Sequence, residues 1–167
     1  MPLRVTALCV FLGFLFASGG ANAQGAVGQG ILGAWTLVSV EGVRDDGTKS
    51  EPFGPNPKGI IIFSPGGYFS LFQSRADVPK IAANDREKAT PEEAKAVIAG
   101  AIAYYGTYSV NEADKALSVR LQASTYANLV GGEQKRVVTS LTTDELKFAN
   151  PRTPAGLTLH TTWNRAQ

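Results

Sequence analysis

The stretch Leu157-Thr158-Leu159-His160-Thr161-Thr162-Trp163-Asn164-Arg165 decides the fold, because two kinds of side chain alternate along it. In an extended chain the mostly apolar set points to one side: Leu157, Leu159, Thr161 and Trp163. The polar set between them points to the other side: Thr158, His160, Thr162 and Asn164. One dry face and one wet face are typical of an antiparallel strand that borders an interior.

The same chemistry recurs upstream, where Leu117, Val119 and Leu121 alternate with polar residues. We predict strands at 32–41, 58–64, 67–74, 103–111, 116–122, 134–141, 144–150 and 157–165. Most of the connections are short and rich in Gly, Pro, Asn and Asp, and such links join antiparallel neighbours. The sequence therefore predicts an all-β fold, an eight-stranded antiparallel up-and-down β-barrel that holds packed side chains or one small ligand.

Two segments interrupt the succession of strands. Residues 45–57 contain three Pro and two Gly and predict a long irregular loop. In 75–102, Thr90-Pro91-Glu92-Glu93 supplies an N-cap Thr, a Pro at the first helical position and a Glu at the third. This capping box predicts one short inserted helix, and its apolar positions lead us to expect that it lies against the sheet or covers an opening.

The N-terminal residues have the composition of an export signal. Arg4 precedes an apolar run and small residues that end at Ala21-Asn22-Ala23, which predicts a signal peptide over 1–23. We expect a flexible N-terminus at 24–30, a barrel domain at 31–167, and a periplasmic or extracellular location. The apolar run is too short for a spanning helix, so we expect no stable membrane insertion.

Composition excludes several kinds of site from the part that remains after cleavage. The chain's one Cys and one Met lie in the signal segment, and the single His is His160. We therefore expect no disulfide, no metal site, no cofactor and no His-based catalytic relay. Sixteen Lys and Arg stand against fourteen Asp and Glu, so nucleic acid is not an expected partner.

Residues at the two ends of the barrel carry a family resemblance. Gly33 and Trp35 on the first predicted strand, with Arg165 at the end of the last, resemble the lipocalin and wider calycin signature. The resemblance implies that Arg165 covers Trp35 and closes the barrel base, which makes these residues structural. A guanidinium suits this role, since it stacks on an indole ring while its N–H groups cap carbonyls.

A longer series of motifs is similar to the bacterial and fungal lipocalin-like domain family. The series runs through Leu32–Ser39, Pro57–Tyr68, Arg75, Thr90–Glu93, Ala103–Tyr108, Ser124 and Gly131–Arg136. The resemblance implies a single β-barrel with an inserted helix and covers residues 31–165. It implies little about biochemistry.

Candidate ligand-binding residues follow from strand parity and chemistry. They are Phe63, Phe72, Arg75, Tyr104, Tyr108, Leu121, Ser124, Arg136 and Val138. A buried phenol seeks a hydrogen-bond partner, and an inward Arg can hold an anionic or carbonyl group. For the two Tyr residues, packing with satisfied hydroxyls is the alternative, and for Arg136 the alternative is a solvated strand face.

We expect the barrel to bind a small, largely hydrophobic molecule, and the sequence shows no catalytic residue set. Two alternatives stay open: an enzyme that isomerises or cyclises a hydrophobic substrate through a Tyr or Arg, and a packed barrel that serves as a protein-interaction module. A small cavity together with an exposed apolar patch would favour the module. Neither the ligand nor the oligomeric state follows from the sequence.

Overall fold

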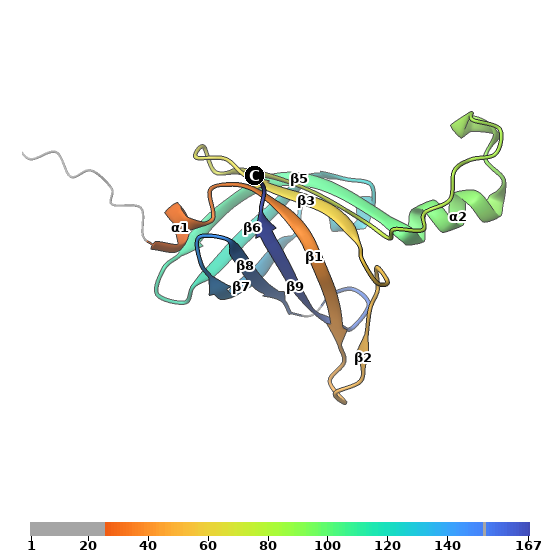
Figure 1. Cartoon of the computed structure of the whole chain (residues 1–167). Coiled ribbons are helices and arrows are strands. Elements are labelled where there is room, and N and C mark those ends of the chain that lie inside the picture. The colour runs from red at the N-terminus through yellow and green to blue at the C-terminus, as the bar shows by residue number, and fades with distance from the viewer. Residues whose placement is uncertain (1–25, 152) are drawn as a thin grey trace, which may run out of the picture.

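Eight of nine strands wind into a closed barrel in the computed structural model, which describes residues 26–151 and 153–167 (Figure 1). The strands are β1 (Gly33–Val43), β2 (Lys49–Ser50), β3 (Lys58–Phe63), β4 (Tyr68–Ser74), β5 (Ala101–Asn111), β6 (Ala116–Ser124), β7 (Glu133–Leu141), β8 (Glu145–Asn150) and β9 (Thr158–Arg165). The helical segments in this part are α1 (Ala26–Gly30), α2 (Pro91–Gly100) and two single turns at 86–88 and 127–129.

Every strand pairs antiparallel with its neighbours, in the order β2-β1-β3-β4-β5-β6-β7-β8-β9, and β1 also pairs with β9. The β1–β9 pairing closes the sheet, with Trp35 opposite Arg165 and Val43 opposite Thr158. The predicted eight-stranded up-and-down barrel is confirmed. The two-residue strand β2 is an addition, since it forms within the segment predicted to be an irregular loop and pairs with the end of β1.

The barrel has a closed end and an open end. At the closed end, beside α1, large side chains pack across the interior; Trp35, Phe63, Leu117, Leu146 and Trp163 are among those almost wholly buried. The predicted parity of β6 and β9 is confirmed, since Leu117 and Trp163 are inward while Arg120 and His160 are exposed. The interior of this half is therefore filled by side chains.

Arg165 joins the two ends of the sheet at the closed end. Its guanidinium carbon lies 4.0 Å from the centre of the Trp35 ring. Nη1 donates to the Leu32 carbonyl at 2.9 Å and Nη2 to the Gly30 carbonyl at 2.8 Å, and Nε donates to the Thr143 carbonyl. Residue 33 has a φ of 102°, which favours the glycine found there. This is the arrangement that the resemblance implies.

The segment 24–30, expected to be flexible, contains the short helix α1 (Ala26–Gly30). Its Val27 is buried and contributes to the core together with Ile31. The Glu112 carboxylate accepts hydrogen bonds from the backbone N–H groups of Val27 (3.0 Å) and Gly28 (2.7 Å). A remote carboxylate thus satisfies donors that begin a helix and have no partner within it.

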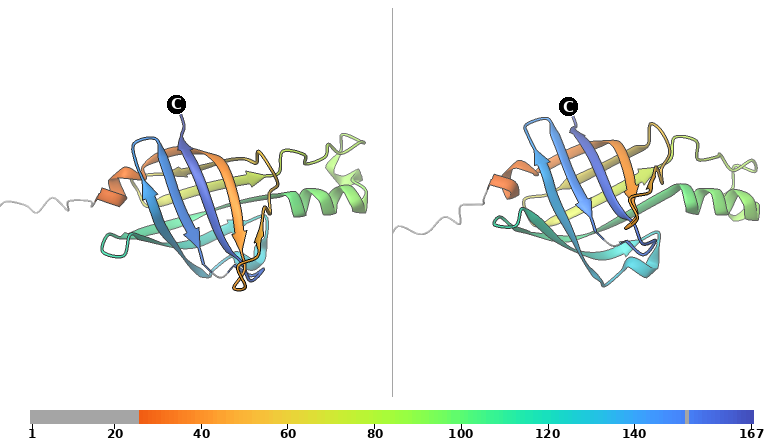
Figure 2. Two further views of the ribbon diagram at one scale, coloured as in Figure 1. Left: turned by 60° about the horizontal axis from the view of Figure 1, so that its bottom comes forward. Right: turned by 90° about the horizontal axis from the view of Figure 1, so that it is seen from below.

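The inserted helix α2 is confirmed, but its expected place is wrong. Thr90 and Glu93 form the predicted capping box, and the N–H groups of Ala82 and Thr90 donate to the Glu93 carboxylate, which lowers its pKa. The helix projects beyond the open end instead of lying on the sheet (Figure 2), and Ile98 is 76% exposed. At the end of the helix, a Cβ at Gly100 would lie 3.0 Å from a side-chain carbon of Val78 in the preceding loop.

Gly106 is fixed by a close approach between β5 and β6. The ladder shifts register between Tyr105 and Gly106, and a Cβ at 106 would lie 2.0 Å from the Arg120 carbonyl oxygen. The β-bulge therefore requires a residue without a side chain, for reasons of space and not of backbone angle.

We expect Arg165→Ala to lower the free energy of unfolding by about 2 to 4 kcal/mol, because it removes a stacked cation and its charge-assisted hydrogen bonds. Urea unfolding followed by the fluorescence of Trp35 and Trp163 measures it. The control is Arg86→Ala, an exposed residue that should change stability by less than about 0.5 kcal/mol. Equal effects of the two variants would contradict the role of Arg165.

Gly106→Ala should destabilise the barrel by about 3 kcal/mol or more, since the clashing atom is backbone. Gly66→Ala is the matched control, because the nearest atom to its Cβ would be the Ser64 Oγ at 3.9 Å. Thermal melting of both variants is the measurement. A stable Gly106→Ala protein would show that the bulge can relax.

Candidate functional site

A pocket of about 710 Å³ occupies the open end of the barrel. Its wall residues come from strand ends and from the loops that join them, and they include Phe53, Ile102, Leu129, Leu157 and Leu159. Glu133 and Lys135 contribute at the start of β7. The volume is in the range of small-molecule sites, and apolar walls with a few polar groups are typical of them.

Polar side chains form the inner part of this pocket. Gln73 and Thr161 are buried, and Tyr104 is 9% exposed. Asn150 also lines the pocket, and its side-chain oxygen is buried without a hydrogen-bond partner. The pocket is therefore apolar on its walls and able to make hydrogen bonds deeper inside.

On β7, Arg136 is the next inward-facing residue after the pocket residue Gln134, toward the closed end. Its side chain is almost wholly buried, with 1% exposed. Its Nη2 donates to the Tyr104 hydroxyl at 3.0 Å, while Nε and Nη1 are buried without partners. The guanidinium carbon lies 5.4 Å from the Phe69 ring centre and 5.7 Å from that of Tyr104. Arg136 therefore points into the barrel interior and does not lie on a solvated strand face.

Four other predicted ligand residues belong to the packed interior. Phe63, Leu121 and Val138 are buried in the core cluster, and Tyr108 packs edge-on against Phe63 with ring centres 5.2 Å apart. The Tyr108 hydroxyl donates to the Ser64 carbonyl at 2.8 Å, and burial raises the pKa of this phenol. None of the four lines the open-end pocket.

Three predicted residues lie outside the interior, which corrects their expected placement. Phe72 is 43% exposed, because β4 turns Phe69, Leu71 and Gln73 inward and so turns Phe72 outward. Arg75 is exposed beyond the end of β4 and pairs with Asp77 at 2.8 Å.

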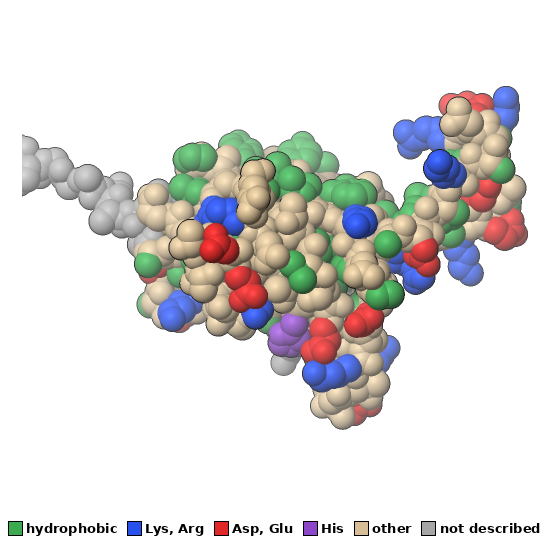
Figure 3. Space-filling view, in the orientation of Figure 1, with side chains coloured by type: hydrophobic (Ala, Val, Ile, Leu, Met, Phe, Trp, Pro, Cys, Tyr) green, Lys and Arg blue, Asp and Glu red, His purple; other side chains and the backbone are tan. Residues whose placement is uncertain are grey.

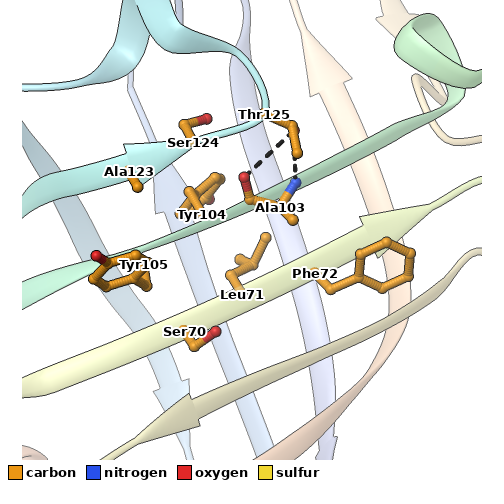
Figure 4. Close-up of a pocket in the computed structure, with 9 residues that line it drawn as sticks. All are labelled: Ser70, Leu71, Phe72, Ala103, Tyr104, Tyr105, Ala123, Ser124 and Thr125. Atoms are coloured by element: carbon orange, nitrogen blue, oxygen red, sulfur yellow. Dashed lines mark hydrogen bonds between the residues drawn. The ribbon is translucent and has the colours of Figure 1, made fainter. Parts of the chain in front are cut away.

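Ser124 is the third. Its hydroxyl accepts a hydrogen bond from the Tyr126 N–H at 3.0 Å within the turn that follows β6. It lies with Phe72 and Tyr105 on a shallow outer groove (Figure 4). The bulge between Tyr105 and Gly106 changes which side chains share a face here.

The groove belongs to an exposed apolar area on the outer wall, which we call the outer face. It spans β1, β3, β4 and β5 and consists of Val38, Ile60, Ile62, Phe72 and Tyr105. Ile60 is the ladder partner of Phe72, so these side chains are neighbours. Figure 3 shows hydrophobic side chains along the side of the barrel where Figure 1 places β3 and β5.

The ligand-binding residues expected from the sequence omit most of the pocket, including Gln73, Ile102 and Asn150, and Leu159 is expected only to face the interior. Strand alternation is the signal that could identify them, because each lies two residues from an inward-facing residue on its strand. Gln73, for example, lies two residues from Leu71. The loop residues Phe53 and Leu129 carry no such signal, since period-two alternation does not extend into loops.

Within 26–151 and 153–167, no group of three His, Asp or Glu residues is arranged to hold a metal ion. Among the same residues, no helix has the length and apolar character needed to cross a membrane.

A family model described as a lipocalin-like domain matches residues 32–166. Among solved structures, a redesigned β-barrel is 16% identical, with 83% of this chain and 94% of that chain covered and a TM-score of 0.42. A de novo designed fluorescence-activating β-barrel is 11% identical, with 83% and 95% covered and a TM-score of 0.43. The comparison with curated proteins finds no match.

Arg136→Met should raise the free energy of unfolding by about 1 to 3 kcal/mol, because it replaces a buried charge that has no ionic partner with an apolar side chain of similar length. Tyr104→Phe should lower it by about 1 to 2 kcal/mol in the natural background and by less in the Arg136→Met background. Urea unfolding of this double-mutant cycle is the measurement. A large loss of stability in Arg136→Met would mean that the charge is compensated.

Proposed function

The chain belongs to the lipocalin-like domain family, and we propose that it binds a small, largely hydrophobic molecule in the open-end pocket. The observation that carries the proposal is the division of the barrel into a packed half and a half with a pocket of about 710 Å³. A barrel needed only as a stable scaffold gains by filling its interior, because voids forfeit packing contacts.

The pocket walls support a hydrophobic ligand body. Phe53, Ile102, Leu129, Leu157 and Leu159 come from different strands and loops and surround the same space. Transfer of an apolar ligand from water to such walls contributes about 25 cal/mol for each Å² that is buried. The deeper polar groups would then set the orientation of the bound molecule.

An enzyme that isomerises or cyclises its ligand is the second candidate. It is favoured by Tyr104, which lines the pocket and whose hydroxyl accepts a hydrogen bond from the Arg136 guanidinium. Such a hydroxyl can donate to a substrate carbonyl and stabilise negative charge that develops on it. Conversion of a bound polyene or polyketide that is lost in Tyr104→Phe, with binding retained, would establish this activity.

The interaction-module hypothesis meets only one of its two conditions. The outer face supplies the exposed apolar patch, but the cavity is not small. Ligand binding therefore explains more of the structure.

We also propose that the protein is exported, on the basis of the signal-peptide pattern over residues 1–23, which lie outside the described part. N-terminal sequencing of protein recovered from outside the cytoplasm should then begin at Gln24.

Ligands with apolar bodies of about ten to sixteen carbons, present at about a hundred times their Kd, should raise the melting temperature by about 5 to 10 °C. Leu159→Trp should reduce the shift, because the larger side chain narrows the pocket. The control is Ile98→Trp on the projecting helix, which should leave it unchanged. If no fatty acid, alcohol, retinoid or aromatic probe produces a shift, the proposal fails.

A further inference from the structure

The polar groups at the floor of the pocket specify the chemistry of a ligand more closely than its apolar walls do. By floor we mean Arg136 together with Tyr104, the pocket residue that it touches. On β7, Gln134, Arg136 and Val138 point inward in succession, from the pocket toward the packed half. The ladder partner of Arg136 is Leu117, which is fully buried. The guanidinium therefore lies at the boundary between the pocket and the core.

Arg136 is a buried cation without a counter-ion. Across the part of the chain that the structure describes, the ion pairs involve other residues, and none includes Arg136. A guanidinium has five N–H donors, yet Arg136 makes one hydrogen bond, to a neutral hydroxyl. Nε and Nη1 have no partner. Buried charges in proteins are normally paired and hydrogen-bonded, so this group lacks an anion.

Tyr104 connects this cation to the pocket. Arginine has no acceptor, so in the 3.0 Å contact the Tyr104 oxygen accepts from Nη2. The Tyr104 proton is then free to be donated to a second acceptor. Tyr104 lines the pocket and Arg136 does not, so an anion that enters from the open end reaches the guanidinium by way of Tyr104.

We propose that the bound molecule carries a carboxylate, which the Tyr104 hydroxyl and the Arg136 guanidinium receive at the floor while its apolar body lies against the pocket walls. The inference rests on the proposed function and specifies its ligand class. A single buried cation matches one negative charge, which favours a carboxylate over a doubly charged phosphate. Lys135, the basic residue at the rim, is exposed and lies 3.9 Å from the Asp114 carboxylate, so it adds little charge at the floor.

Competition at pH 8 tests the proposal, with Nile red as a neutral displaceable probe and three ligands that share a twelve-carbon chain: dodecanoate, dodecanol and dodecyl phosphate. We expect dodecanoate to bind about ten- to a hundredfold more tightly than dodecanol, as charge-assisted hydrogen bonds imply. Arg136→Met should reduce this preference to near unity while dodecanol still binds. Tyr104→Phe should give an intermediate preference.

The matched control is Arg75→Met, which removes an exposed arginine that does not line the pocket and should keep the full preference. Equal binding of dodecanoate and dodecanol by the natural protein would overturn the carboxylate assignment and leave the proposed function standing. In that case only internal water would hydrogen-bond to the free N–H groups of Arg136. Tighter binding of dodecyl phosphate would overturn the choice of carboxylate. Failure of all three ligands to bind would remove the proposed function as well. Far-UV circular dichroism verifies that each variant folds.

Discussion

The structure depends on the closure of one sheet onto itself between β1 and β9. An open sheet of this size would leave two edges with unpaired backbone groups, and the ladder from Trp35–Arg165 to Val43–Thr158 removes most of both. Arg165 holds the register of this pairing, because its side chain reaches the Gly30 and Leu32 carbonyls on the segment that leads into β1. The signature residues Gly33, Trp35 and Arg165 therefore stabilise the closed barrel, and they lie at the end opposite the pocket.

This separation assigns different physical tasks to the two halves. At the closed end α1, Glu112 and the buried aromatic rings complete a dense core. At the open end the interior is bordered by Gln73, Tyr104 and Thr161, and Arg136 marks the boundary. A charged residue at this boundary reduces stability when it has no partner, so its presence is easier to understand as a requirement of binding than of folding.

Local signals in the sequence were sufficient for most of the fold. Runs of β-forming residues bounded by turn residues located all eight principal strands, and the Thr90–Glu93 capping box located α2, because each depends on residues close together in the chain. Placement that depends on distant partners was not accessible in this way. The apolar positions of α2 did not reveal that the helix projects outward, and α1 is anchored by Glu112, which is 85 residues from Val27 in sequence.

The site residues also divide into those that local sequence signals can indicate and those that depend on distant partners. Strand position and the chemistry of buried groups make Tyr104 and Arg136 candidates, although the sequence leaves open whether Arg136 points inward. Phe72 faces outward, whereas the sequence-based assignment turned it inward. The bulge at Gly106 shifts the register of β5 against β6, which changes the residue that lies opposite Ser124. The loop residues of the pocket could be found only once the strands were assembled, since their shared location arises from barrel closure and not from any pattern within the loops.

The projecting segment between β4 and β5 leaves and rejoins the barrel at a single place. Ser74 is the ladder partner of Ala101, and the Arg75 N–H donates to the Gly100 carbonyl at 2.8 Å, so the ends of the excursion are already joined as in a hairpin. In terms of chain topology, residues 76–99 form an excursion that begins and ends at one place in the sheet. A tight turn that joined the same two ends would leave every strand pairing in place.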